Sequence, residues 1–216
     1  MAAYPENSDN LSEFISETMI KHNCPLWITL NQVKEIKTMK GAFWSNVNLQ
    51  KLELLDNWTI ENATEYKVEP ESLLESKQNN LLSSTLIATN GHEARKILHL
   101  HYTGWPDCEE ASDEEFLFNC ILIIHKLTRD LPEDQYFGIN CAHGLGRTGI
   151  VAAVLLAIKE IDKQLKEKSL ADVVINIPEI IYRMRLQRNS KIPGISKQFI
   201  QVYTQVSRYV EKLRLV

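Results

Sequence analysis

The stretch from Ile139 to Gly149, INCAHGLGRTG, combines a cysteine, an arginine and three glycines in eleven residues. A glycine-rich loop that leads into a helix presents successive backbone N–H groups and the positive end of the helix dipole, and both attract an anion. The guanidinium of Arg147 can bind two oxygens of a phosphate at once. The stretch therefore predicts a loop that binds a phosphoryl group.

Cys141 lies where this positive field is strongest, so we expect its thiol to exist largely as the thiolate. A thiolate beneath a bound phosphate is placed to attack phosphorus. Two alternatives are weaker. A role as a small core residue ignores the coincidence of cradle, charge and nucleophile. A dinucleotide-binding loop would follow the first strand of a βαβ unit and need an acidic residue about twenty positions on, and here Asp162 or Glu167 would have to serve from the far end of a helix.

Hydrophobic periodicity predicts the elements that position this loop. We expect a strand from Tyr136 to Asn140 before it and an apolar helix from Thr148 to Lys163 after it. Further strands are predicted at Leu26–Leu30, Trp58–Val68 (a strand or hairpin), Leu81–Ala88 and Lys96–Tyr102. Further helices are predicted at Leu11–Lys21, after a capping box at Ser112–Glu115, at Ile177–Leu186, and from a cap at Ser196 with an inner stripe of Phe199, Tyr203, Val206, Val210 and Leu213. Together they predict an α/β fold in which a mixed twisted sheet carries helices on both faces.

Composition limits the function classes. The chain has 216 residues, 44% apolar, with a net charge of −4, which is consistent with a single domain over residues 1–216 and gives no support for a nucleic-acid or membrane-surface partner. It has no apolar stretch long enough for a membrane span and no secretory signal at its start, so we expect a cytoplasmic protein. The four cysteines show no spacing typical of zinc, and Cys120 falls in an apolar helical pattern that predicts a core position. The polar segment from Glu71 to Asn80 is predicted to be a connection too short to divide domains.

Three motifs resemble those of the cysteine-dependent protein tyrosine phosphatases. CAHGLGRTG is similar to their phosphate loop, C-x5-R-[ST]-G, and HYTGWPD, His101 to Asp107, resembles the mobile loop whose Trp-Pro-Asp carries the general acid. MRLQRNSKIPGISKQF, Met184 to Phe199, resembles the segment that leads into the family's glutamine loop. Its MRLQRN part is similar to phosphatases that pathogenic bacteria inject into host cells, which would place the protein in the host cytosol.

The resemblance implies hydrolysis of phosphotyrosine in proteins through a cysteinyl-phosphate, with no metal or cofactor. Cys141 would be the nucleophile, Asp107 the general acid and then the general base, and Thr148 would stabilise the departing thiolate. Gln198 would match the second glutamine of the glutamine loop. The phosphoryl oxygens would bind Arg147 and the N–H groups of Ala142, His143, Gly144, Leu145, Gly146 and Arg147.

The chain departs from the family pattern at three points. Asn140 precedes the nucleophile where the family has histidine, and Gly194 stands where the first glutamine helps position the hydrolytic water. Nothing upstream of Leu11 resembles the tyrosine-containing loop that recognises the substrate ring, which is consistent with a short member of the family or a fragment of a longer protein. Two alternatives therefore stay open: a pseudophosphatase that binds phosphotyrosine proteins without turnover, and a phosphatase for another phosphoester, such as a phosphoinositide.

Several residues near the motifs have no assigned role. Trp105 and Pro106 are expected to form the hinge of the loop that carries Asp107. Cys108 could form a protective disulfide with Cys141, although a solvent-facing thiol without a role is the simpler interpretation. Arg185 and Arg188 are expected to support the core and the phosphate loop through carboxylate pairs. The sequence leaves open whether His143 reaches the substrate or points away.

Overall fold

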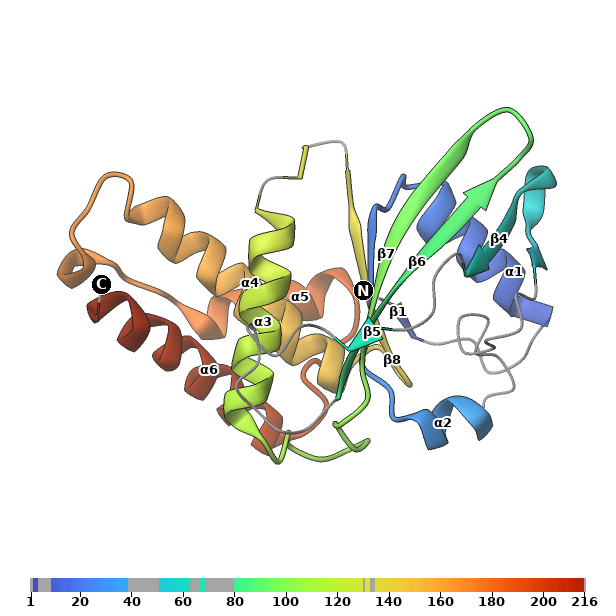
Figure 1. Cartoon of the computed structure of the whole chain (residues 1–216). Helices are drawn as coiled ribbons and strands as arrows, with labels where there is room; N and C mark the ends of the chain where they lie inside the picture. Colours follow the sequence, from blue (N-terminus) through green and yellow to red (C-terminus); the bar gives the residue numbers. More distant parts are fainter. Residues whose placement is uncertain are drawn as a thin grey trace.

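The computed structural model describes residues 2–3, 9–38, 51–62, 67–68, 80–129, 131–132 and 135–215 (Figure 1). The strands are β1 Ala2–Ala3, β2 Leu26–Thr29, β3 Leu52–Glu53, β4 Thr59–Asn62, β5 Lys67–Val68, β6 Leu81–Thr89, β7 Ala94–Tyr102 and β8 Phe137–Cys141. The helices are α1 Asp9–Ile15, which continues as a π-helical segment over Ser16–Ile20, α2 Val33–Thr38, α3 Glu114–Thr128, α4 Gly146–Gln164, α5 Ile177–Gln187 and α6 Ser196–Arg214.

The described strands form one sheet in the order β1-β8-β2-β7-β6-β4-β3, with β5 paired to β6. β8, β2 and β7 run parallel to one another, and β1 is parallel to β8. β7, β6, β4 and β3 pair antiparallel. The sheet is therefore mixed, as predicted, and its parallel half contains the strand that leads into the glycine loop.

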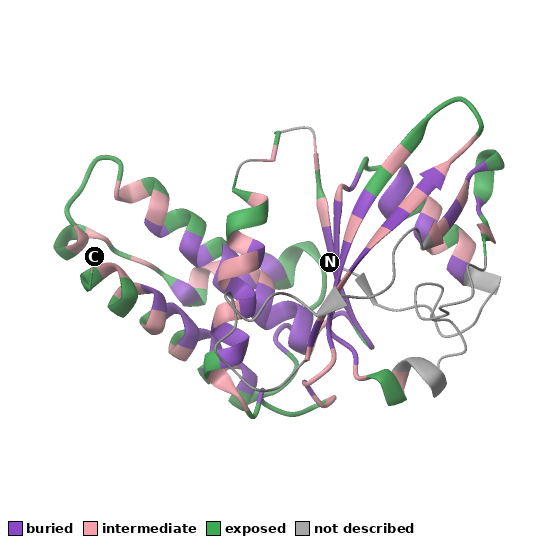
Figure 2. Ribbon diagram, in the orientation of Figure 1, coloured by how far each residue is buried: buried purple, intermediate pink, exposed green. Residues whose placement is uncertain are grey.

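Helices cover both faces of this sheet. The helices α3 to α6 gather on one side and α1 lies on the other (Figure 1). Because side chains alternate along a strand, β2 contributes to both layers: Leu26 and Ile28 pack into the core beneath α3 to α6, whereas Trp27 packs into the core beneath α1. Figure 2 shows buried residues concentrated where α4 and α6 face the rest of the fold. The predicted fold class is confirmed.

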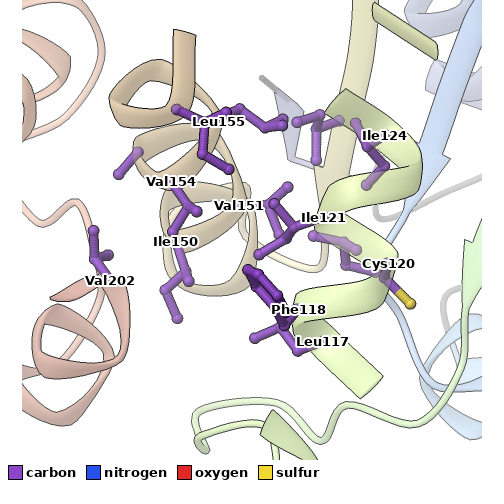
Figure 3. Close-up of a cluster of buried hydrophobic side chains, with 14 of the residues drawn as sticks. Leu117, Phe118, Cys120, Ile121, Ile124, Ile150, Val151, Val154, Leu155 and Val202 are labelled. Atoms are coloured by element: carbon purple, nitrogen blue, oxygen red, sulfur yellow. The ribbon is translucent and has the colours of Figure 1, made fainter. Parts of the chain in front are cut away.

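The main core lies between α3 and α4, whose apolar side chains interlock (Figure 3). Cys120 lies in this cluster with 3% of its surface exposed, which confirms its predicted core position, and burial raises the pKa of its thiol. Val202 of α6 lies on the other side of α4 from α3 (Figure 3). The apolar character of α4 is explained by this burial on several sides.

Two predicted helix caps are wrong. Asp113, not Ser112, caps α3, since its Oδ1 accepts from the N–H of Phe116 at 2.8 Å. At the start of α6, Ile195 occupies the cap position without a side-chain bond, and Ser196 is the first helical residue. In both segments the predicted residue lies one position away from the residue whose backbone is extended at the cap, and the path of the arriving loop decides that position.

The inner face of α6 also differs from the prediction. Val206 is buried, but Tyr203 is 38% exposed. The buried face carries three glutamines among its members: Gln198, Gln201, Val202, Gln205, Val206 and Tyr209. The periodicity argument selects apolar residues only, so it cannot find a face on which amides are buried because they bond to backbone carbonyls.

Some predictions fall partly outside the described residues. The segment predicted as Trp58–Val68 contains β4 and β5, and residues 63–66 between them lie outside the description. The same holds for residues 71–79 of the predicted polar connection. Within the described ranges, no helix has both the length and the apolar character needed to cross a membrane.

A polar network lies inside the sheet on the side of Trp27. Thr29 Oγ1 donates to Asn140 Oδ1 at 3.0 Å, so it accepts from His99 Nε2, also at 3.0 Å. His101 Nε2 bonds to the carbonyl of Asn31 at 2.7 Å. Burial and the charge of His101 lower the pKa of His99 well below 6.5, and burial lowers that of His101 to about 4. Both rings are therefore neutral in the folded protein at neutral pH.

These histidines predict an acid-sensitive fold. Because their pKa values are lower in the folded than in the unfolded chain, their contribution to stability is present above pH 6.5 and is lost as the pH falls toward 4. We expect the free energy of unfolding, measured by urea titration, to fall over this range. His99→Gln with His101→Gln should flatten that slope, whereas His92→Gln, in the exposed turn before β7, should leave it unchanged. An equal slope in the double variant would contradict the assignment.

Candidate active site

The site forms at one edge of the sheet. Since β2, β7 and β8 are parallel, their carboxyl ends meet there, and the segment that follows each strand reaches the same place. α2 follows β2 and supplies Glu35, the loop after β7 supplies Asp107, and the phosphate loop follows β8 with Cys141 to Arg147. Three segments far apart in the sequence are thereby brought together.

The phosphate loop joins the last residue of β8, Cys141, to the first residue of α4, Gly146. Gly144 has a φ of +64°, a conformation that other residues rarely adopt. Leu145 at the cap position makes no side-chain bond to the helix, so no side-chain cap takes up the first N–H groups of this 19-residue helix. The sulfur-bearing residue Cys141 is 2% exposed at the base of the loop. This is a geometry suited to an anion.

Arg147, in the first turn of α4, is the charged centre of the site and is 1% exposed. Its Nη1 donates to Glu35 Oε1 at 3.0 Å and to the carbonyl of Trp105 at 2.8 Å. Its Nη2 donates to Glu35 Oε2 at 2.7 Å and to Asp107 Oδ1 at 2.8 Å. Nε has no hydrogen-bond partner among the described residues. The guanidinium is thus held on two sides, with one buried donor unused.

The charge of Arg147 is secured by its neighbours. Burial alone would lower the pKa of the guanidinium, but its hydrogen bonds to Glu35 and the charges of Cys141, Glu35 and Asp107 more than offset it, so the pKa is raised. A buried arginine paired in this way stays charged and keeps its orientation. Sequence reasoning missed Glu35, whose only signal is a carboxylate shortly after a buried strand.

Asp107 is 35% exposed and lies between Arg147 of α4 and His143 of the phosphate loop. Its Oδ1 accepts from Arg147, and its Oδ2 is 3.7 Å from Nδ1 of His143. His143 is 68% exposed, so its side chain faces Asp107 at the mouth of the loop. A contact between His143 and the substrate stays a prediction.

Cys108 has a φ of +57° and is exposed. Its thiol donates to Asp107 Oδ2 at 3.6 Å, and the charge of Asp107, with burial and this bond, raises its pKa despite the opposing charge of Arg147. A raised pKa disfavours the thiolate that disulfide formation needs. The interpretation of Cys108 as a thiol without a redox role is therefore favoured.

Asn140 lies directly before the nucleophile candidate and is fully buried. Its Oδ1 accepts from Trp27 Nε1 at 2.8 Å and from Thr29 Oγ1, so both hydrogen bonds anchor β8 to β2. Trp27 packs over Gly138, where an added Cβ would lie 2.0 Å from the indole ring. The amide at position 140 thus holds the strand that carries Cys141.

Thr148 and Gln198 lie deeper behind the loop. Thr148 is fully buried and its Oγ1 has no hydrogen-bond partner among the described residues. Gln198 is 2% exposed, and its amide oxygen fills the space beside Gly146 and Gly194, where added Cβ atoms would lie 2.7 and 3.1 Å from it. Gln198 therefore reaches the phosphate loop from α6.

For Arg185, one of the two arginines of the third motif, the structure differs from the prediction. Both are exposed, and Arg185 Nε donates to the carbonyl of Ile192 at 2.6 Å, with no carboxylate partner among the described residues. Arg188 Nε donates to the carbonyl of Gly144 at 3.3 Å, so it does contact the phosphate loop. Exposed arginines need no carboxylate to offset burial, which removes the premise of the prediction.

Among the residues that the structure describes, no three His, Cys, Asp or Glu side chains are arranged to hold a metal ion. At this edge Arg147 instead lies between two carboxylates, Glu35 and Asp107, and the ring of His143 lies beside Asp107. Such a set, next to a cysteine at the base of a loop that leads into a helix, can bind an oxyanion, attack it and exchange a proton with it.

Comparison with known proteins finds relatives among the tyrosine phosphatases. Tyrosine-protein phosphatase non-receptor type 12 of Homo sapiens is 27% identical over 133 residues, which cover 59% of this chain and 15% of that protein. Tyrosine phosphatase H2 of Microplitis demolitor bracovirus is 29% identical over 142 residues, covering 60% of this chain and 41% of that protein. The chain thus spans less than half the length of these two curated relatives.

Solved structures establish the fold. The protein tyrosine phosphatases of Trypanosoma cruzi and Trypanosoma brucei superpose with TM-scores of 0.71 at 16% identity, covering 93% and 94% of this chain and 64% and 66% of theirs. The family model described as protein-tyrosine phosphatase matches residues 12–208. With that match over most of its length, the chain belongs to the protein-tyrosine phosphatase family.

Proposed function

We propose that the protein hydrolyses phosphotyrosine in proteins through a cysteinyl-phosphate intermediate. The observation that carries the proposal is the buried guanidinium of Arg147, which has Glu35 on one side, Asp107 on the other and an unused Nε donor. A phosphoryl group is the ligand that best fits this donor together with the loop N–H groups from Ala142 to Arg147. The family membership supports the same substrate class.

Binding of the phosphoryl dianion changes the partners of Arg147. The bidentate bond to Glu35 fixes the orientation of the guanidinium, so that the edge formed by Nε and Nη2 faces the phosphoryl group. Asp107 Oδ1 occupies Nη2 at 2.8 Å, so the dianion competes with this carboxylate. Once displaced, Asp107 is free to carry a proton and to reach the ester oxygen on the other side of the phosphorus.

In the first chemical step the Cys141 thiolate attacks phosphorus. The S–P bond forms as the P–O bond to the tyrosyl oxygen breaks, and Asp107 gives that oxygen its proton, so tyrosine leaves neutral. Arg147 and the loop N–H groups stabilise the charge that spreads over the three phosphoryl oxygens in the transition state. His143, beside Asp107, lies at the entrance that the substrate ring crosses.

In the second step water attacks the phosphocysteine. The ionised Asp107 takes a proton from the water, the S–P bond breaks, and inorganic phosphate leaves. The free hydroxyl of Thr148 donates to the departing thiolate. Gln198 reaches the loop behind Gly146, whereas Gly194 offers no side chain to direct the water. The second step therefore has fewer groups to assist it than the first.

Variants of the two reacting side chains test the proposal. With a phosphotyrosine peptide, we expect Cys141→Ser to abolish turnover and Asp107→Asn to lower kcat about 100- to 1,000-fold, a typical value for loss of a general acid. Phosphopeptide binding, measured calorimetrically, should persist in both. Glu110→Gln, an exposed acid in the same loop, is the matched control and should retain full activity. Tight binding without turnover in the wild type would instead identify a pseudophosphatase, and preference for a phosphoinositide would identify another phosphoester as substrate.

Gly194 predicts a slow second step. Rapid mixing with a chromogenic aryl phosphate should release a burst of phenol equal to the enzyme concentration, followed by slower steady turnover. A Cβ added at position 194 would lie 3.1 Å from the amide oxygen of Gln198 and no closer than 3.5 Å to the Gly146 backbone, so we expect Gly194→Gln to fold. We expect this variant to raise the steady rate and to reduce the burst. A wild type without a burst would show that phosphorylation limits the rate.

Glu35 should matter although it does not touch the substrate. Glu35→Gln removes the ionic partner of a buried guanidinium, so we expect kcat/KM for aryl phosphates to fall and stability to drop by about 3 kcal/mol. Glu93→Gln, which breaks an exposed pair with Arg95, is the control and should change neither. Unaltered kcat/KM in Glu35→Gln would show that the phosphate loop alone orients Arg147.

A further inference from the structure

Three glutamines share the buried face of α6. Gln198, Gln201 and Gln205 are each 2% exposed or less. A helix face of this kind is normally apolar, because an amide taken out of water without hydrogen bonds costs free energy. The partners of these amides must therefore explain why they lie there.

All three amides donate to backbone carbonyls of one short segment. Nε2 of Gln198 bonds to the carbonyl of Glu109 at 3.3 Å, and that of Gln205 bonds to the carbonyl of Glu114 at 3.3 Å. Gln201 binds Ala111 twice, since its Nε2 donates to the carbonyl and its Oε1 accepts from the N–H, both at 3.4 Å. The segment 109–114 is the part of the chain that joins Asp107 to α3.

The other end of the same loop is held by the phosphate-loop helix. The carbonyl of Trp105 accepts from Arg147, and Trp105 Nε1 donates to the carbonyl of Glu109 at 2.9 Å, across the loop. Trp105 is fully buried. The loop that carries Asp107 is therefore fixed at one end by a charge and at the other by amides of α6.

Apolar residues at the same positions of α6 would fill the space but leave the loop less defined. Ala111 is 3% exposed, so without Gln201 its buried N–H and C=O would both lose their described side-chain partner. A paired amide also fixes the register of the segment along α6, which apolar packing does not. Gln205, one turn further along α6, holds the start of α3, since it donates to the carbonyl of Glu114, the first residue of that helix.

We propose that Gln201 and Gln205 are positioning residues for the general acid: they fix the segment from Ala111 to Glu114 on α6, so that Asp107 reaches the leaving oxygen from a defined base. This inference rests on the proposed function of Asp107. It adds a second anchor for the loop, on α6. Gln201 and Gln205, which form this anchor, lie outside the three sequence motifs, whereas Gln198 lies in the third.

The test uses the dependence of kcat/KM on the leaving group. Strongly acidic phenols depart as anions and need no proton, whereas phenol and tyrosine depend on Asp107. With phenyl phosphate and a phosphotyrosine peptide, we expect Gln201→Leu to lower kcat/KM about tenfold or more, part of the 100- to 10,000-fold that a general acid supplies. With dinitrophenyl phosphate, the loss should be much smaller.

Tyr209→Phe is the matched control. Tyr209 lies on the same face of α6, but its hydroxyl bonds to Asp162 of α4 and not to the loop. A merely structural loss would lower the activity toward all three substrates equally, as we expect for Tyr209→Phe if it has any effect. If Gln201→Leu does not fold, Gln205→Met provides the same comparison.

Asp107→Asn, measured in parallel, separates this inference from the proposed function. A steep leaving-group dependence in Asp107→Asn and in Gln201→Leu supports the inference. The same dependence in Asp107→Asn with a uniform loss in Gln201→Leu overturns it and leaves the general acid in place. If Asp107→Asn shows no leaving-group dependence, the assignment of the acid fails, and the positioning role fails with it.

Discussion

The positive charge of Arg147 is the feature on which the rest of the site depends. A buried guanidinium is costly unless its charge is paired, and here Glu35 comes from α2, whereas Asp107 and the Trp105 carbonyl both come from the loop after β7. Satisfying this one charge therefore determines where α2, the loop after β7 and the start of α4 lie relative to one another. The same set of bonds leaves Nε without a partner in the part of the chain that the structure describes, so this donor is the one that an oxyanion would take.

The sequence predicted the parts of the site that are local in the chain. The loop between β8 and α4 was predicted because its strand, glycines, cysteine and arginine follow one another directly in the chain. The Trp-Pro-Asp loop was predicted because its motif is also one continuous stretch. Glu35 could not be found in this way. Its role follows from the parallel pairing of β2 with both β7 and β8, and pairing order is a long-range property that periodicity does not contain. The same limit applies to Arg185, whose exposure depends on how α5 packs.

The buried polar residues were the second kind of miss, and they share a physical cause. Asn140, His99 and the α6 glutamines occupy positions where a rule based on apolar periodicity expects hydrocarbon. Each is tolerated because a specific partner lies opposite: Trp27 and Thr29 for Asn140, Thr29 for His99, and the backbone of residues 109–114 for the glutamines. Such partners become visible only once strands and helices are placed, so the sequence correctly gave the layers of the fold and not the polar contacts between them.

The two anchors of the acid loop differ in kind, and this difference fits the chemistry. The bond between Asp107 and Arg147 is ionic, and in the proposed mechanism a substrate dianion competes for the same Nη2 donor, so this anchor would be exchanged when substrate binds. The hydrogen bonds from the side-chain amides of Gln201 and Gln205 join neutral, buried groups. An incoming anion does not compete for these donors. A loop held at one end by an exchangeable ion pair and at the other by fixed amides can release its carboxylate without losing its place. The exchangeable anchor is the charge of Arg147 on α4, and the fixed anchor is the pair of amides of Gln201 and Gln205 on α6.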